Sequence, residues 1–196
     1  MKRIVLGITG ASGCLYARRL AQLLIDSGCR VDAIVSGHGA DLMRRELGAA
    51  RVSAASLLGR RDRRITMHRF DNIADELASG SVPTDGMAVC PCSANTLAAI
   101  AAGLAGNLIT RAAHVHLKQR RPLVLVPREM PVSPIELENQ LRLARAGAII
   151  APACPGFYLA PKSIDDLVDF VAARVAHCLG AGHDLDVKYR PTGEPT

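Results

Sequence analysis

Aromatic residues are scarce in this sequence, and the long apolar runs of membrane proteins are missing. Only 3% of its 196 residues are aromatic and none is tryptophan. Few rings can therefore stack on bases, which disfavours a reader of single-stranded nucleic acid. No apolar run approaches the about 18 residues of a membrane span, and Gly7 and Gly10 interrupt the first apolar segment too early for a signal peptide. We expect a cytoplasmic protein without a membrane partner.

The cysteines lack the pattern of a disulfide scaffold or a zinc site. All six are scattered along the chain, and most lie in apolar segments. Only Cys90 and Cys92 are close, and one intervening residue is not the two-residue spacing of a zinc knuckle. The Asp-Asp-x-x-Asp run with which terpene enzymes bind metal is also absent. We expect buried thiols in a reducing compartment, and no metal site.

The composition is that of a globular protein with a moderate positive charge. Hydrophobic residues make up 49% of the chain and charged residues 21%, so a sizeable core can be buried. The net charge of +6 suits an anionic small ligand as well as a polyanion. The basic block Arg60–Arg64 is typical of a solvated loop, and we expect no nucleic-acid partner.

Strand and helix signals alternate along the chain. The predicted strands are Arg3–Ile8, Val31–Val35, Met87–Cys90, Pro122–Val126 and Ala148–Ala151. The predicted helices follow the apolar stripe Leu15–Ile25 and then span Ala40–Leu47, Ala94–Ala102, Leu108–Gln119, Pro134–Ala146 and Ser163–Leu179. Residues Ala49–Asp71 show no clear pattern. This order predicts one doubly wound α/β domain over residues 1–180, Rossmann-like or flavodoxin-like, with a mostly parallel sheet and helices on both faces. A polar C-terminal tail would follow over 181–196.

The first candidate site is the glycine-rich turn Gly10–Gly13 after the first strand. Ligands of doubly wound folds bind beyond the carboxyl ends of the strands, and a helix N-terminus there supplies amide donors to a phosphate. A dinucleotide site would also need an acid at the end of the second strand. Ser36 stands at that place, and Asp32 lies early in the strand. The turn therefore favours a phosphate-bearing ligand other than NAD.

Two more polar groups follow strands. Ser93, Asn95 and Thr96 lie where a strand meets a helix, and they form either a ligand turn or an ordinary helix cap. Arg128 and Glu129 directly follow another strand. Opposite charges at the carboxyl end of a strand favour a functional role over a surface ion pair.

Three cations have positions on helices that suggest an anionic ligand. Arg111 and Lys118 are two helical turns apart and are predicted to share a face with His114 and Val115. Arg174 falls at helical spacing from buried positions of the last helix. A solvated helix face would explain Lys118 but not Arg174. A buried cation needs an anion, which is either a protein carboxylate or a ligand phosphate.

The loop Pro155–Pro161 follows the last predicted strand and is bounded by proline and glycine. It would either act as a lid that brings Tyr158 onto a bound phosphate or pack as an ordinary apolar loop.

Taken together, several segments resemble the UbiX-type flavin prenyltransferases. They are GITGASG, PTDGMAVCPCSANTLAAIA, NLITRAA, LKQRRPLVLVPRE, LENQLRLARAGAII and PGFYLAPKSIDDLVDFVAARV. The resemblance runs in order up to about Leu179, and residues 1–180 would be the flavoprotein domain. It implies an enzyme that binds FMN, transfers a dimethylallyl group from dimethylallyl phosphate to reduced FMN, and supplies prenylated FMN to a separate UbiD-type decarboxylase. It also implies a homo-oligomer, a dodecamer in this family.

The resemblance assigns roles to individual residues. It places FMN against Thr9, Gly10, Ala11, Ser36, Ser93, Ala94, Asn95, Thr96 and Arg128. It places the prenyl phosphate among Arg111, Lys118, Tyr158 and Arg174, and it puts Ser12, Glu46 and Glu129 near the reacting centre. The chain departs from the family's usual residues at Ala94-Asn95, Leu104–Leu108 and Leu159–Pro161.

The chemistry of such a transfer needs charge and a base. Arg111, Lys118 and Arg174, with Tyr158, would neutralise the leaving phosphate without a metal. Flavin N5 would attack the allyl carbon, and the following ring closure requires removal of a proton. Glu129 or the departing phosphate is the candidate base. Both a monophosphate and a diphosphate donor are compatible with these cations.

Two alternatives remain open at this point. The turn Ser93–Thr96 is very similar to the PASANT turn of flavin-dependent cysteine decarboxylases, for whose catalytic histidine His68 is a loose positional candidate. Those enzymes carry Pro-x-Met-Asn where this chain has Val126–Glu129. A non-catalytic FMN carrier is the second alternative, but a carrier would not need the second set of phosphate-binding cations.

Overall fold

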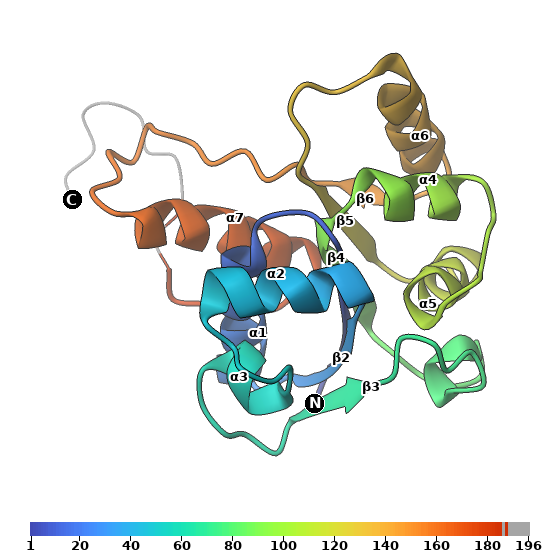
Figure 1. Ribbon diagram of the computed structural model, residues 1–196, viewed down its shortest axis with the longest axis horizontal. Helices are drawn as coiled ribbons and strands as arrows, with labels where there is room; N and C mark the ends of the chain where they lie inside the picture. The colour runs from blue at the N-terminus through green and yellow to red at the C-terminus, as the bar shows by residue number, and fades with distance from the viewer. Residues whose placement is uncertain (186, 188–196) are drawn as a thin grey trace.

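A computed structural model describes residues 1–185 and 187. The described residues form a six-stranded sheet in the order β3-β2-β1-β4-β5-β6, and every paired strand is parallel to its neighbour (Figure 1). The strands are β1 (Arg3–Ile8), β2 (Arg30–Val35), β3 (Ile65–His68), β4 (Gly86–Cys92), β5 (Leu123–Pro127) and β6 (Ile149–Ile150). The helices are α1 (Cys14–Asp26), α2 (Gly37–Leu47), α3 (Ala54–Leu58), α4 (Ala94–Ala101), α5 (Leu108–Lys118), α6 (Pro134–Arg145), α7 (Ile164–Cys178) and the short 3₁₀ helix η1 (Glu76–Ala78).

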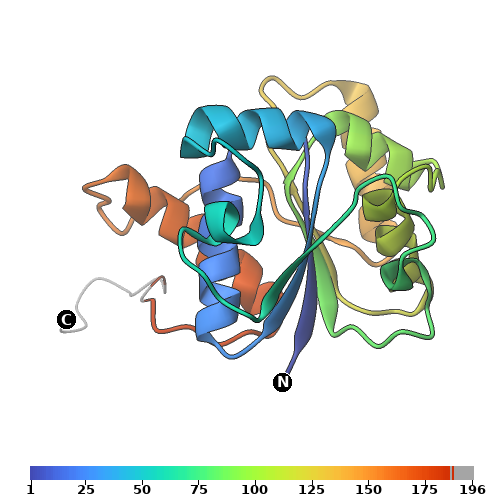
Figure 2. The ribbon, with the colours of Figure 1, turned by 60° about the horizontal axis from the view of Figure 1, so that its bottom comes forward.

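The sheet separates two apolar cores. Side chains of a strand point alternately to opposite faces, so Ile4, Leu6 and Ile8 of β1 pack with α1, α3 and α7, whereas Val5 packs with α4 and α5. Figure 2 shows α1 and α7 on one side of the edge-on sheet and α4, α5 and α6 on the other. This arrangement confirms the predicted doubly wound fold.

The helix-start signals in the sequence behave as predicted. Ser133 and Glu136 form the capping box of α6, and Ser163 and Asp166 form that of α7. In each pair the serine accepts the backbone N–H of the acid, and the acid accepts that of the serine. Asp166 is therefore a capping residue.

Two local predictions were incomplete. Helix α2 begins at Gly37 rather than Ala40, because Ser36 caps it by accepting the N–H of Gly39 at 3.0 Å. The segment Ala49–Asp71, which showed no pattern, contains both α3 and the edge strand β3. These elements are only 5 and 4 residues long, too short for a periodic signal.

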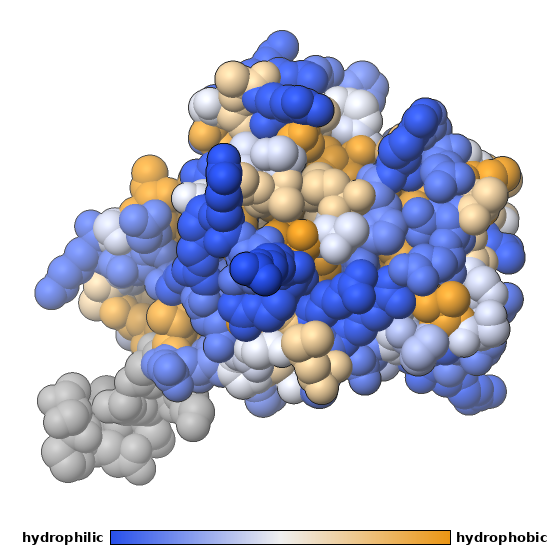
Figure 3. Space-filling model, turned by 90° about the horizontal axis from the view of Figure 1, so that it is seen from below, coloured by the Kyte–Doolittle hydropathy of each residue, from blue (hydrophilic) through white to orange (hydrophobic). Residues whose placement is uncertain are grey.

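The basic block Arg60–Arg64 lies in the loop between α3 and β3, as predicted. Arg64 pairs with Asp62 at 2.7 Å, and Arg60 pairs with Asp26. Hydrophilic side chains cover most of the face that carries β3 and the N-terminus (Figure 3). Local carboxylates thus already engage part of the basic block.

The described part of the predicted tail packs on the domain. Ala181 is buried, a ring nitrogen of His183 hydrogen-bonds to the carbonyl of Ala173 at 3.1 Å, and Leu185 and Val187 contact the α1–α7 core. The rest of the predicted tail lies outside the described residues. Within the described residues, no helix combines the length and apolar character needed to cross a bilayer.

Two glycines in the first turn of α2 form a matched pair for a stability test. A Cβ at Gly39 would lie 2.7 Å from the carbonyl oxygen of Ile8, whereas a Cβ at Gly37 would meet nothing within 4 Å. We expect Gly39→Ala to lower the free energy of unfolding by about 1–3 kcal/mol through overpacking. Gly37→Ala should leave it unchanged or raise it slightly. Urea denaturation of both variants measures the difference, and equal stabilities would contradict the close packing of α2 on β1.

Candidate active site

Thr9 joins the ends of the two central strands. Its hydroxyl donates to the carbonyl of Pro91 at 2.9 Å and accepts the backbone N–H of Ser93 at 2.7 Å. The residue is 1% exposed, so its side chain serves the scaffold. This bridge holds the turn that begins at Gly10 beside the turn that begins at Ser93.

Three helices of the described chain begin at one open cleft of about 710 Å³ beside these turns. Their caps are Ser36 for α2, Ser93 for α4 and Asn107 for α5, and all three line the cleft together with Gly10. Free amides and helix dipoles at the N-termini favour an anion there. Two charged residues in the lining, Asp41 and Arg44, form an ion pair with each other at 2.7 Å. The cleft is therefore built for a phosphate-bearing ligand.

The cleft accounts for much of the predicted cofactor set. Gly10, Ser36, Ser93, Asn95 and Thr96 all line it. Thr9 and Ala11 flank Gly10 in the sequence, and both are buried. A Cβ at Gly10 would lie 2.7 Å from the Cβ of His38, so only glycine fits this approach of the turn to α2. Ala94 opens α4 next to its cap.

Arg128 and Glu129 directly follow β5, between the ends of its two neighbours. Pro127 pairs with Cys92 of β4, and its carbonyl accepts the N–H of Ala153 beyond β6 at 3.0 Å. Among the described residues, nothing accepts a hydrogen bond from the buried Nε of Arg128. Glu129 is exposed, and its carboxylate accepts the N–H of Met130 at 3.3 Å.

These observations fit the FMN that the resemblance implies. Helix N-termini suit its phosphate, and the unsatisfied donor of Arg128 suits a polar atom of its ring system. The volume of the cleft lies within the about 300–1,000 Å³ of typical ligand sites.

Glu46 fixes the glycine-rich turn. Its half-buried carboxylate accepts the N–H of Gly13 at 3.0 Å and that of Cys14 at 2.7 Å. Gly13 has φ +126°, a conformation that other residues rarely adopt. Ser12 is exposed on the same turn. Glu46 therefore makes a capping contact at the turn that carries Ser12, and the roles of both residues near the reacting centre stay predictions.

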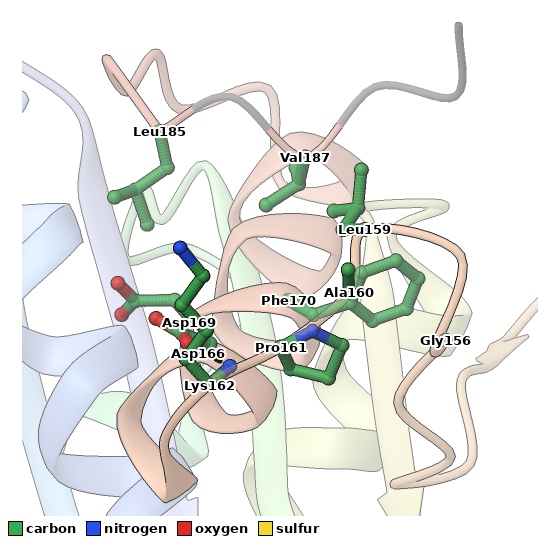
Figure 4. A pocket seen from close by; sticks show the side chains of 10 residues that line it. All are labelled: Gly156, Leu159, Ala160, Pro161, Lys162, Asp166, Asp169, Phe170, Leu185 and Val187. Carbon is green, nitrogen blue, oxygen red and sulfur yellow. Dashed lines mark hydrogen bonds between the residues drawn. The ribbon is translucent and has the colours of Figure 1, made fainter.

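The loop that carries Tyr158 packs on α7. The rings of Tyr158 and Phe170 meet edge to face, with centroids 5.8 Å apart. Figure 4 shows Leu159 and Ala160 of this loop near Phe170, with Leu185 and Val187 above them, around a hollow of about 280 Å³. The segment from Phe157 to Leu159 is nevertheless exposed. The structure thus shows this loop in contact with α7. That it closes as a lid over a bound phosphate stays a prediction.

The prediction that Arg174 is buried was wrong. Its side chain is exposed, while Val171 and Val175 are buried. Three residues correspond to about 300° around a helix, so Arg174 lies at the edge of the apolar stripe rather than on it. It lines an apolar hollow of about 320 Å³ beside β6, together with Ile150 and Cys154.

The other two predicted cations lie across the sheet from Arg174. Arg111 is half-buried on α5, and its Nε donates to the carbonyl of Ala78 at 3.0 Å. Lys118 is exposed at the end of α5 and Val115 is buried, although helical spacing puts both on the side that carries Arg111. Because α5 and α7 cover opposite faces (Figure 2), one chain does not bring together the four residues that were predicted to bind the prenyl phosphate.

Sequence reasoning missed part of the cleft wall. Phe70, Asn107 and Thr110 line it, and Asn107 and Thr110 form the capping box of α5. That pair was detectable, because Asn followed three residues later by Thr before an apolar helix is a start signal. Phe70 lies in the segment without a periodic pattern.

Four of the six cysteines are buried, namely Cys14, Cys29, Cys90 and Cys92, and all six are free thiols. Burial raises the pKa of Cys14 and of Cys92 to about 12, so these thiols stay protonated. Cys154 is exposed and Cys178 half-buried, so the expectation of buried thiols holds for the first four.

Comparison with known proteins now identifies the family. The sequence profile of the Flavoprotein family matches residues 1–176. A curated relative from Pseudomonas aeruginosa, named flavin prenyltransferase UbiX, is 43% identical over 192 residues, which cover 94% of this chain and 92% of the relative.

Solved structures agree with the sequence match. A dodecameric FMN-dependent UbiX-like decarboxylase from Escherichia coli O157:H7 has a TM-score of 0.88 at 38% identity and covers 96% of this chain and 100% of its own. AnUbiX, solved in complex with FMN and dimethylallyl pyrophosphate, has a TM-score of 0.86 at 36% identity and covers 99% of both chains. From its near-complete match to these relatives, the chain belongs to the UbiX flavin prenyltransferases within the Flavoprotein family.

Proposed function

We propose that this chain is a flavin prenyltransferase that moves a dimethylallyl group from dimethylallyl phosphate to reduced FMN. Prenylated FMN would then serve a separate UbiD-type decarboxylase. The observation that carries the proposal is the cleft where α2, α4 and α5 begin beside the Gly10 turn, in a chain whose relatives carry this activity in their names.

The proposed FMN site consists of the cleft and the residue after β5. The amides at the caps Ser36 and Ser93 and the turn at Gly10 would hold the phosphate end. Asn95 and Thr96 line the same wall, and Arg128 would satisfy its free Nε on the ring system. Thr9, Ala11 and Ala94 would contribute backbone and apolar surface. Reduced FMN, when bound, supplies the nucleophilic nitrogen of the transfer.

The donor phosphate would be neutralised by residues from more than one copy of the chain. Arg111 and Lys118 lie on one face of the sheet, and Tyr158 and Arg174 lie on the other. A phosphate that needs both pairs requires a neighbouring copy to supply one of them. The dodecameric relative supports this arrangement. We therefore propose a homo-oligomer, a dodecamer, whose sites are shared between copies.

Glu129 is the proposed proton acceptor, with the departing phosphate as the alternative. Its exposed carboxylate lies at the carboxyl edge of the sheet, directly after Arg128. A carboxylate there can take a proton from a ligand in the adjoining site. Glu46 would act by holding the Gly13 amide in place, and Ser12 would offer its hydroxyl from the same turn.

The structure disfavours the cysteine decarboxylase alternative. Its candidate histidine, His68, has both ring nitrogens bonded to carboxylates, at 2.9 Å to Asp32 and 3.0 Å to Asp75. It is absent from the lining of the cleft. The carrier alternative leaves the exposed cations Lys118 and Arg174 without a role. The free thiols support the proposal that the protein works in the reducing cytoplasm.

The activity itself is tested by anaerobic incubation with reduced FMN and dimethylallyl phosphate. Mass spectrometry of the extracted flavin should show FMN enlarged by one five-carbon unit, and a parallel reaction with the diphosphate donor gives the preferred leaving group. FAD should bind less tightly than FMN in equilibrium dialysis, because the helix N-termini suit a terminal phosphate. Unmodified flavin from every donor would refute the proposed function.

Sharing of the site between copies is tested by mixing variants. Arg111→Ala and Arg174→Ala should each weaken donor binding about ten- to a hundredfold, the range for one charge-assisted contact. Mixed oligomers, co-expressed and purified through two different tags, should regain activity in roughly a quarter of their sites, because random assembly leaves some sites with both arginines. Oligomers of either variant alone are the controls, and a mixture as inactive as they are would contradict sharing.

The base is tested by Glu129→Gln. The amide keeps the size of the side chain but cannot accept a proton at neutral pH, so both ligands should still bind while single-turnover product formation falls about a hundredfold or more. Glu138→Gln, at an exposed position of α6, is the control. A wild-type rate in Glu129→Gln would instead make the departing phosphate the base.

A further inference from the structure

His68 is held between two carboxylates at the end of the edge strand β3. Its Nε2 lies 2.9 Å from Oδ1 of Asp32, and its Nδ1 lies 3.0 Å from Oδ2 of Asp75. Asp32 is completely buried, and the side chain of His68 is 10% exposed. A neutral imidazole has a single N–H and would turn a lone pair toward one of the carboxylates. Two carboxylate partners therefore favour the imidazolium, which can donate to both.

Side-chain ion pairs surround His68 in a cluster to which the imidazolium adds a positive charge. The carboxylates are Asp32 on β2, Asp75 before η1 and Glu76 on η1, and the cations are Arg3 on β1 and Arg30 on β2. Arg3 donates to Asp32 at 2.6 Å and also bonds to Glu76. Three carboxylates thus face two arginines, and the imidazolium supplies the third positive charge.

The same contacts set the direction of the pKa shifts. The hydrogen bond to Asp32, followed by that to Asp75, raises the pKa of His68 against the opposing effect of burial. Burial by itself would raise the pKa of Asp32, but hydrogen bonds from His68 and Arg3 outweigh it and lower that pKa.

Asp75 connects the imidazolium to the segment that supports one wall of the cleft. Its other oxygen, Oδ1, accepts the N–H of Leu77 at 3.1 Å and so caps η1. The carbonyl of Ala78 at the end of η1 accepts the Nε of Arg111 at 3.0 Å. At the other end of the segment, the carbonyl of Phe70 accepts the N–H of Leu108 at the start of α5 at 2.9 Å. Phe70 itself lines the cleft.

We propose that His68 is a positioning residue whose imidazolium locks the segment 69–78 against α5, and so fixes the Phe70 wall of the cleft and the orientation of Arg111. The inference rests on the proposed function for the identity of the ligand, FMN. It assigns His68 no contact with FMN. The lock acts through two backbone carbonyls, Phe70 and Ala78, that hold the first turns of α5.

Deprotonation of the His68 imidazolium should weaken its contacts with Asp32 and Asp75. Because the pKa of His68 in the folded protein is raised above its ordinary 6.5, the stabilisation is complete below that ordinary value. It is lost as the pH rises through the folded-state pKa. The segment 69–78 should then loosen, and the affinity for FMN should fall on the alkaline side of neutrality.

The test measures FMN affinity between about pH 6.5 and about pH 9, where the second ionisation of a phosphate monoester is largely complete. At pH 7, His68→Gln should bind FMN about two- to thirtyfold more weakly, the range for a residue that acts through its neighbours. The variant should also lack the alkaline loss of affinity seen in the wild type. His177→Gln, an exposed histidine of α7, should behave as the wild type does. A full alkaline loss in His68→Gln would overturn the proposal.

A second variant keeps the test decisive if His68→Gln folds poorly. Asp75→Asn retains an oxygen to cap η1 but removes one carboxylate from His68, so the midpoint of the alkaline loss should move to lower pH. An unmoved midpoint would overturn the lock.

Measurements without ligand separate this inference from the proposed function. In wild-type protein labelled with ¹⁵N-histidine, both ring nitrogens of His68 should be protonated at neutral pH. The protection of the Leu108 amide, which is its exchange rate relative to the intrinsic rate of an unstructured amide at the same pH, should fall above the pKa of His68. A neutral ring or unchanged protection would refute the lock. Failure to bind FMN at any pH would refute the proposed function, while the exchange data still decide the lock.

Discussion

The Thr9 hydroxyl, shared between the carbonyl of Pro91 and the amide of Ser93, holds together the two strands from which the site is built. Strands β1 and β4 are neighbours in the sheet, but the chain leaves β1 for α1 on one face and β4 for α4 on the other. A crevice opens where the connections diverge. The caps of α2, α4 and α5 line it because each follows the end of a strand or of another helix at this edge.

The electrostatics of the site come from backbone more than from side chains. The charged residues that line the cleft, Asp41 and Arg44, bond to each other, so helix N-termini provide the attraction for an anion. Side-chain cations are instead distributed over both faces, with Arg111 on α5 and Arg174 on α7. The sheet keeps these two groups of cations apart within one chain. The proposed second phosphate site therefore requires assembly of several copies.

A buried carboxylate, that of Asp32, lies outside the lining of the cleft. Asp32 sits in the middle of β2 with no exposure, where an isolated carboxylate would be strongly unfavourable. Arg3 and His68 compensate it from the strands on either side. The arrangement joins β1, β2 and β3 with η1, and through η1 it reaches α5. His68, a loose positional candidate for the catalytic histidine of another enzyme class, is instead bonded to two carboxylates in this fold.

Local signals in the sequence determined the order of elements and the polar residues that follow each strand, because caps, apolar periodicity and glycine turns act over a few residues. Ser36, Ser93 and the Gly10 turn were identifiable in this way. Tertiary structure decided features that depend on residues far apart in the sequence. The exposure of Arg174 depends on where α7 meets the sheet, and Glu46 reaches the Gly13 amide across 33 residues of chain. The short elements α3 and β3 exist because their neighbours bury Leu57, Leu58 and Ile65. Contacts between distant residues determine these features, and no local pattern encodes them.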